Sequence, residues 1–249
     1  MDLADLPDLS YGTIDRDYVA TLAAMDPSDD GPVWMVNLMR YREQAVYADG
    51  RDTDLTGREA DDRYAPFGPF REVGAELVFL ADVEEQLVGD DQTWDRIAVV
   101  RYPTRRSFLD MQDLPEYVEL HEHKEAGMEF TIVMGTEPVA TGPGTAADGS
   151  LVLRVRRVAD GGAGAEPDGV TPVAHFTVDG VILGDARTWN DVRFDRVRPD
   201  AIAAPARSAV FSFDSIALFA RAEEATASVG SYWSTIRWSA ITRPSQSGR

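Results

Sequence analysis

One six-residue pattern, Gly-Asp-x-x-Thr-Trp, occurs twice in this chain and constrains its fold more than any other feature. It spans residues 89–94 and again 184–189, and each copy is followed by a segment led by Ile or Val and then by a proline. Each copy also falls between two predicted strands, at the same place in the strand order. We interpret the pattern as an internal duplication. The second copy is degenerate, because a Gly/Pro-rich loop over 161–172 replaces most of its first helix.

The predicted elements of the first half follow the order helix–β–α–β–β–α–β. Apolar runs predict strands over 33–39, 77–82, 96–102 and 130–134. Helical spacing predicts helices over 18–25, 63–73 and 104–127, with breaks at the prolines of the second and at 114–115 in the third. This is the ferredoxin-like order, an antiparallel sheet with helices on one face.

A Gly/Pro/Ala-rich linker over 141–148 separates the two halves. We therefore predict an α+β protein with a ferredoxin-like unit and an extra N-terminal helix over 1–140. A divergent second ferredoxin-like unit is predicted over 149–245. Its expected strands span 151–158, 173–183, 192–197 and 232–241, and its expected helix spans 216–227.

The net charge of −19, from 24 basic and 43 acidic residues, excludes polyanions as partners. Nucleic acids and anionic membranes are bound by clustered Lys and Arg, whereas Lys124 is the only lysine here. The absence of cysteine excludes disulfides, thiolate nucleophiles, Fe–S clusters and cysteine-based zinc sites. The acidic N-terminus does not resemble a signal peptide, and no apolar run approaches 18 residues. We expect a soluble, cytoplasmic protein that takes a small molecule.

Three histidines are the scarcest residues with chemical potential. His121 and His123 lie about 200° apart around a predicted helix, so they do not share a metal, and no metal site is expected. The projection places His121 beside Tyr117, toward the sheet, and His123 toward solvent. His121 is either a hydrogen-bonded core histidine or an acid/base whose near-neutral pKa suits proton transfer. The same two interpretations apply to His175, on a second-half strand where the first half has Leu80.

Asn37 lies in the middle of an apolar strand, where a buried amide needs hydrogen-bond partners. It either makes a structural hydrogen bond or polarises a substrate carbonyl and holds an enolate oxygen. Strand alternation places Met35 on the same face and Trp34 on the other. The candidate substrate-binding residues are Trp34 and Met35 and, as the family resemblance given below implies, Tyr64 and Tyr117, with packing as the alternative role for each.

Several short motifs resemble one bacterial family. They are Val36-Asn37-Leu38, Gly57-Arg58-Glu59 with Tyr64, Gly74-Ala75-Glu76-Leu77-Val78, Trp94-Asp95-Arg96, Tyr102-Pro103-Thr104-Arg105, Pro115-Glu116-Tyr117 and His121-Glu122-His123-Lys124-Glu125-Ala126. Over roughly residues 15–136 the chain resembles the domain-of-unknown-function family 1330, a branch of the dimeric α+β barrel superfamily. That resemblance implies two ferredoxin-like units paired into a barrel. The duplication would place both in one chain, as an intramolecular pseudo-dimer that does not require homo-oligomerisation.

Relatives in that superfamily include cofactor-free oxygenases, lactone isomerases, polyketide cyclases, haem peroxidases and non-catalytic stress proteins, so the fold does not settle the function. The first hypothesis is an isomerase, cyclase or oxygenase without an organic cofactor, acting on an apolar carbonyl-bearing or aromatic substrate. His121 or His175 would move the proton, and Asn37 with a tyrosine would steady the oxyanion. The alternatives are a non-catalytic ligand-binding or stress-responsive module, and a haem protein with His121 or His175 as axial ligand.

Overall fold

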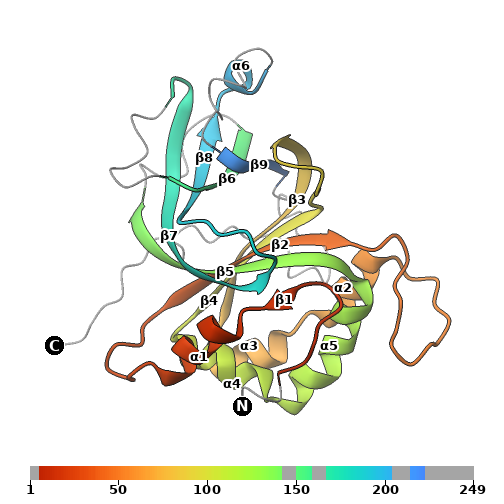
Figure 1. Ribbon diagram of the computed structural model, residues 1–249. Helices are drawn as coiled ribbons and strands as arrows, with labels where there is room; N and C mark the ends of the chain where they lie inside the picture. The colour runs from red at the N-terminus through yellow and green to blue at the C-terminus, as the bar shows by residue number, and fades with distance from the viewer. Residues whose placement is uncertain (1–5, 142–149, 159–166, 204–213, 222–249) are drawn as a thin grey trace. The chain divides into compact units, whose positions relative to one another are not determined.

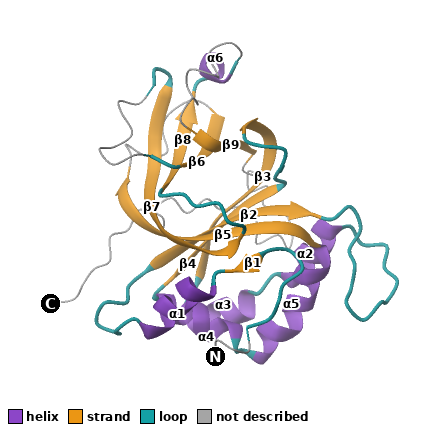
Figure 2. Ribbon diagram, viewed as in Figure 1, coloured by secondary structure: helices purple, strands orange, loops and turns teal. Residues whose placement is uncertain are grey.

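The computed structural model describes residues 6–141, 150–158, 167–203 and 214–221 (Figure 1). They form an α+β protein, which confirms the predicted class (Figure 2). The strands are β1 (Thr13–Ile14), β2 (Val33–Tyr41), β3 (Glu76–Val88), β4 (Arg96–Tyr102), β5 (Met128–Thr141), β6 (Ser150–Arg156), β7 (Val170–Gly184), β8 (Asp191–Val197) and β9 (Asp214–Arg221). The helices are α1 (Arg16–Ala24), α2 (Gly57–Tyr64), α3 (Phe67–Val73), α4 (Arg105–Gln112), α5 (Pro115–Gly127) and α6 (Pro199–Ile202). Among these residues, no helix has the length and apolar character needed to cross a membrane.

The strands are hydrogen-bonded in the order β1-β7-β5-β2-β4-β3-β9-β6-β8, and β7 pairs in addition with β8. The pairs β1–β7, β3–β9, β6–β8, β6–β9 and β7–β8 are antiparallel. The chain divides into two compact units that interleave along the sequence. Unit 1 takes residues 1–77, 100–135 and 181–187, and unit 2 takes 78–99, 136–180 and 188–249. Of the predicted linker over 141–148, only the last residue of β5 belongs to the described residues, so the predicted boundaries stay a prediction.

Strand β2 is central to unit 1, since it is hydrogen-bonded between β5 and β4. Its side chains are buried on both faces except for Asn37 and Arg40, which are half-buried. A continuous apolar strand is typical of a position that is covered on both faces, as its sequence predicts. The Thr131 hydroxyl of β5 donates to the Leu38 carbonyl of β2 at 2.8 Å. The helices of unit 1, α1 to α5, gather at one side of its strands (Figure 2).

The single helix predicted over 63–73 is two helices in the structure. Helix α2 ends at Tyr64 and α3 begins at Phe67, because Pro66 has no N–H to donate and its ring clashes with the preceding turn. Helix α2 packs against α5. The two helices approach closely at Gly57 and Gly127, where a Cβ on either glycine would collide with the backbone carbonyl of the other. This contact fixes the position of α2 against α5.

Replacing Asp30 with alanine should lower the free energy of unfolding by about 1–2 kcal/mol. The Asp30 carboxylate accepts hydrogen bonds from the backbone N–H groups of Arg105 and Arg106, at 2.8 and 3.0 Å. These groups begin α4 and have no acceptor within the helix. Denaturant unfolding measures the change. The matched control is Asp29→Ala, because the exposed Asp29 side chain accepts no hydrogen bond from the described residues; an equal loss in the control would contradict the assignment.

Unit 2 has an apolar sheet face that is centred on Phe194 of β8. The ring of Phe194 lies edge-on to Phe79 of β3 and to Phe176 of β7, with centroids 5.1 and 6.3 Å apart. In the β6–β8 register Leu153 lies opposite Phe194, so both point to this face. All four side chains are almost completely buried. The alternate residues of β6 and β8 point to the other face.

The predicted helix over 216–227 is wrong for its described part, because residues 214–221 form strand β9. Ala217, Leu218 and Ala220 favour a helix in isolation, but β9 pairs with β6 on one side and with β3 on the other. Tertiary pairing therefore outweighs local propensity here. The remainder of that prediction, and the strand predicted over 232–241, lie outside the described residues.

The two Gly-Asp-x-x-Thr-Trp copies form matching turns. The carboxylate of Asp90 accepts from the N–H two residues later at 3.0 Å, and that of Asp185 does the same at 2.8 Å. Such a turn is the local conformation that aspartate favours. The tryptophans that follow, Trp94 and Trp189, are both buried. The pattern therefore has the same conformation at both places.

Candidate functional site

A cluster of aromatic and basic side chains gathers around His121 in unit 1. The Tyr11 hydroxyl lies 2.9 Å from His121 Nε2. The rings of Tyr117 and Tyr64 lie 5.5 and 6.2 Å from the imidazole, centroid to centroid. Lys124, one turn along α5, places its Nζ 5.1 Å from the centre of the Tyr64 ring. We call these five residues the His121 cluster.

Burial sets the protonation states in the cluster. Burial, with a smaller contribution from the charge of Lys124, lowers the pKa of His121 to about 4. The near-neutral pKa expected for this residue is therefore wrong, and the imidazole is uncharged at neutral pH. Burial also raises the pKa of Tyr11 and that of Tyr64 well above the usual value for tyrosine. The cluster thus presents a neutral imidazole against protonated phenols.

Lys124 is the cation of the cluster. Its side chain is half-buried, and burial lowers its pKa, although the Asp61 carboxylate opposes the shift. The Asp61 carboxylate accepts a hydrogen bond of 2.6 Å from the Tyr41 hydroxyl. Within the described part of the chain, the Lys124 amine makes no hydrogen bond or ion pair, and its contact is the Tyr64 ring.

His123 does not face solvent as the helical projection predicts. Its Nδ1 lies 2.7 Å from the Tyr47 hydroxyl, the two rings are edge-to-face, and 21% of its side chain is exposed. The polar stretch after β2 packs against α5, where Ala45 and Tyr47 share a buried cluster with Ala60 and Ala126. The face of α5 that carries His121 and the face that carries His123 are therefore both covered. A helical projection that assumes one buried and one exposed face gives the wrong exposure for His123.

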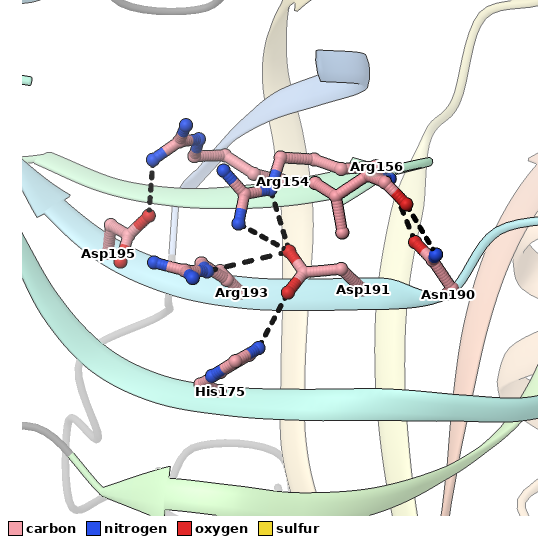
Figure 3. Close-up of polar contacts among 8 residues, drawn as sticks. Arg154, Arg156, His175, Asn190, Asp191, Arg193 and Asp195 are labelled. Carbon is pink, nitrogen blue, oxygen red and sulfur yellow. Dashed lines mark hydrogen bonds and ion pairs between the residues drawn. The ribbon is translucent and has the colours of Figure 1, made fainter. Parts of the chain in front are cut away.

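His175 belongs to a buried charged cluster on the second sheet face of unit 2 (Figure 3). Its Nε2 lies 2.6 Å from Asp191 Oδ2, and the Arg156 Nε donates to Asp191 Oδ1 at 2.6 Å. Arg154 donates to Asp195 at 3.0 Å. Since the register places these residues side by side on β6, β7 and β8, the contacts follow from strand pairing.

The two carboxylates of this cluster respond differently to burial. Burial alone would raise the pKa of Asp191, but the hydrogen bond with His175 and the charge of Arg156 lower it below its usual value. For Asp195, burial outweighs the charge of Arg154 and raises the pKa. These contacts favour the structural interpretation of His175, as a member of an ion-pair network.

Asn37, Trp34 and Met35 lie outside the contacts of the His121 cluster. The Asn37 amide donates to the Met35 carbonyl within its own strand at 2.9 Å. Trp34 and Met35 are almost completely buried, and the Arg101 guanidinium lies 5.5 Å from the centre of the Trp34 ring. Within the described residues, the hydrogen bonds and ring contacts of the His121 cluster involve none of these three. The structure therefore joins His121 with Tyr64 and Tyr117 among the predicted site residues.

Sequence reasoning missed Tyr11 and Lys124 as members of the His121 cluster. Tyr11 precedes the two-residue strand β1, a segment too short for any periodic signal. Lys124 is the only lysine and lies three residues after His121, a spacing that puts two side chains on one face of a helix. That signal was available in the sequence. The described residues hold no group of three or more His, Cys, Asp or Glu placed to bind a metal ion.

The solved structures to which this chain is similar include two of RPA0582. No family model matches the chain, and no curated protein matches it. One structure, of methylated RPA0582, is 31% identical, with 54% of this chain and 98% of that chain covered and a TM-score of 0.46. The other, of RPA0582 from Rhodopseudomonas palustris, a protein of unknown function, is 27% identical, with 53% and 98% covered and a TM-score of 0.45. The membership of family 1330 stays a prediction.

Proposed function

We propose that this protein is an enzyme without an organic cofactor that moves a proton on a carbonyl-bearing small molecule at the His121 cluster. The observation that carries the proposal is the 2.9 Å contact between the Tyr11 hydroxyl and His121 Nε2, with two further tyrosine rings against the imidazole. A neutral imidazole held by a protonated phenol is an acid/base pair that needs no metal. Such a pair is suited to the isomerase, cyclase and oxygenase chemistries.

The hydrogen bond between Tyr11 and His121 suggests which residue is the base and which is the hydrogen-bond donor. When His121 Nε2–H donates to the Tyr11 oxygen, Nδ1 carries the lone pair that accepts a substrate proton. Within the described residues Nδ1 makes no hydrogen bond of its own. The Tyr11 O–H remains available to donate to the oxygen on which negative charge develops.

The low pKa of His121 narrows the class of substrate. A base with a pKa of about 4 is weak, so it suits a carbon acid whose proton is already activated. Carbon flanked by two carbonyl groups, or a phenol-like enol, meets this requirement. The aromatic rings of Tyr64 and Tyr117, which lie edge-to-face with centroids 5.9 Å apart, are compatible with such a substrate.

Removing either partner of the Tyr11–His121 pair should slow proton exchange by about 100-fold. The assay follows C–H to C–D exchange of a panel of β-dicarbonyl compounds and aryl ketones in D2O by proton NMR, relative to buffer. The variants are Tyr11→Phe and His121→Gln. The matched control is His123→Gln, which removes the neighbouring histidine of α5 and should keep the wild-type rate.

Exchange at the buffer rate with every compound in the panel would overturn the enzyme proposal. Saturable chemical-shift changes in the same spectra, without exchange, would favour the non-catalytic ligand-binding module instead. The haem alternative fits the residues less well. The Nε2 atoms of His121 and His175 already contact Tyr11 and Asp191, so an iron bond through either would displace a hydrogen bond.

We also infer that the chain is a tandem of two ferredoxin-like units. The neighbour order of the first four long strands, β5-β2-β4-β3, is 4-1-3-2 in their chain order. The order of the last four, β9-β6-β8-β7, is the same permutation. The N–H groups of Val83 and Val178 also donate to the carbonyls of Asp95 and Asn190, twelve residues later in both cases. Both observations support the duplication predicted from the repeated pattern.

A further inference from the structure

Lys124 is the basic side chain that joins the aromatic rings of the His121 cluster. It is the only lysine, and the remaining 23 basic residues are arginines. Several arginines of the described surface pair with carboxylates, as Arg106 does with Asp110 at 2.9 Å and Arg187 with Asp185 at 2.8 Å. The Lys124 amine, by contrast, lies over the Tyr64 ring and makes no ion pair within the described residues. An amine in a strongly acidic protein that meets no carboxylate calls for another explanation.

We propose that Lys124 is a covalent catalytic residue, whose amine condenses with the carbonyl group of the substrate to form an imine. This inference rests on the proposed function, because it assigns the carbonyl carbon of the same substrate to the lysine next to His121. The two side chains lie three residues apart on α5 and so share a helix face. The Lys124 charge also contributes to the low pKa of His121, as two groups in proximity require.

The step balances without a cofactor. The nitrogen lone pair attacks the carbonyl carbon, and the carbonyl oxygen takes up a proton to give a carbinolamine. Loss of the hydroxyl group as water, which carries away the second amine proton, leaves a C=N bond to the lysine nitrogen. No electron is gained or lost. The imine nitrogen then takes up a proton from solvent, and the protonated imine withdraws electrons from the adjacent C–H bond, so that the weak base His121 removes the proton of that bond.

The surroundings of Lys124 favour the uncharged amine that this chemistry needs. Burial lowers its pKa, and the opposing carboxylate, Asp61, is engaged by the Tyr41 hydroxyl. The contact with the Tyr64 ring favours the charged form and moderates the shift. The other members of the His121 cluster are phenols with raised pKa values and an uncharged imidazole. For an amine whose pKa lies above the pH, each unit by which the pKa is lowered raises the neutral fraction about tenfold.

Reductive trapping in an engineered protein with two lysines tests the proposal directly. In the variant Arg71→Lys, the lysine introduced on the exposed last turn of α3 serves as an ordinary reference amine in the same molecule. The folded variant is incubated at pH 7 with pyruvate or benzaldehyde and sodium cyanoborohydride. Peptide mass spectrometry then measures the rate of alkylation at both lysines. We expect Lys124 to be alkylated at least about tenfold faster than the reference.

Equal rates at the two lysines, or faster labelling of the reference, would overturn the covalent role. A second variant, Lys124→Arg, keeps the charge but forms no imine, and it should lose deuterium exchange while retaining its circular dichroism spectrum. Undiminished exchange in Lys124→Arg would also overturn the covalent step and yet leave the proposed function intact. Loss of exchange in Tyr11→Phe and His121→Gln tests the proposed function separately, so the two failures are distinguishable.

Discussion

Replacing Arg154 with methionine is expected to lower the free energy of unfolding by about 3–5 kcal/mol, the largest loss that we expect from a single substitution in this protein. The guanidinium and its partner Asp195 are at most 2% exposed, and they lie 3.0 Å apart. Removal of the cation leaves a carboxylate buried with one counter-charge fewer. The pKa of Asp195 is raised even in the presence of Arg154, so burial is the largest influence on its charged form. Urea unfolding at pH 7 measures the loss.

The double variant Arg154→Met with Asp195→Leu provides the control. Replacing both charges by apolar groups of similar size removes the desolvation cost together with the attraction, so the double variant should recover most of the lost stability. A double variant that is as unstable as the sum of the two single variants would contradict this account. In that case the loss would come from packing of the methylene chain of Arg154 rather than from charge.

Acidification from pH 6.5 to 4 is expected to destabilise the protein through His121 by about 3 kcal/mol. The pKa of His121 is about 4 in the folded protein, against 6.5 for an ordinary histidine. Between these values the unfolded chain binds a proton at this residue and the folded protein does not. Unfolding is therefore favoured as the pH falls. The stabilisation that the neutral His121 contributes to the free energy of unfolding is fully present above pH 6.5 and is lost near pH 4.

The pH effect of His121 appears as a difference between proteins. The free energy of unfolding of the wild type minus that of His121→Gln should decrease between pH 6.5 and 4. The comparison cancels the titration of the many carboxylates, which is common to both proteins. The matched control is His123→Gln, which removes the neighbouring histidine of α5 and is measured over the same pH range. A constant difference for His121→Gln would show that its imidazole is not buried as a neutral group.

Local chemistry predicted many of the elements of this protein. The apolar run over 33–39 predicted β2, and the interruption at 114–115 predicted the boundary between α4 and α5. The carboxylate of Asp90 and that of Asp185 form the same turn because the repeated pattern supplies the same side chains. Local rules failed where long-range pairing decides. Strand β9, rich in alanine, became a strand because β6 and β3 lie on either side of it.

The candidate site was only partly predictable for a similar reason. His121 and Tyr117 carry a signal in the sequence, because histidine is scarce and helical spacing places Tyr117 beside His121, whereas Tyr64 follows from the family resemblance. Tyr11 carries none, since its contact with His121 joins residues 110 positions apart in the chain. The exposure predicted for His123 failed because the loop that contains Tyr47 covers the second face of α5.

The sequence by itself determined the α+β class, the exclusion of thiol chemistry, and the repeated turn that precedes both tryptophans. These properties depend on composition or on residues that are close together in the chain. Only the tertiary structure decided the protonation state of His121, the contact of Lys124 with a ring instead of a carboxylate, and the ion-pair network of His175. Each of these depends on burial and on partners distant in the sequence, since the energy of a charge is set by the groups that surround it in space.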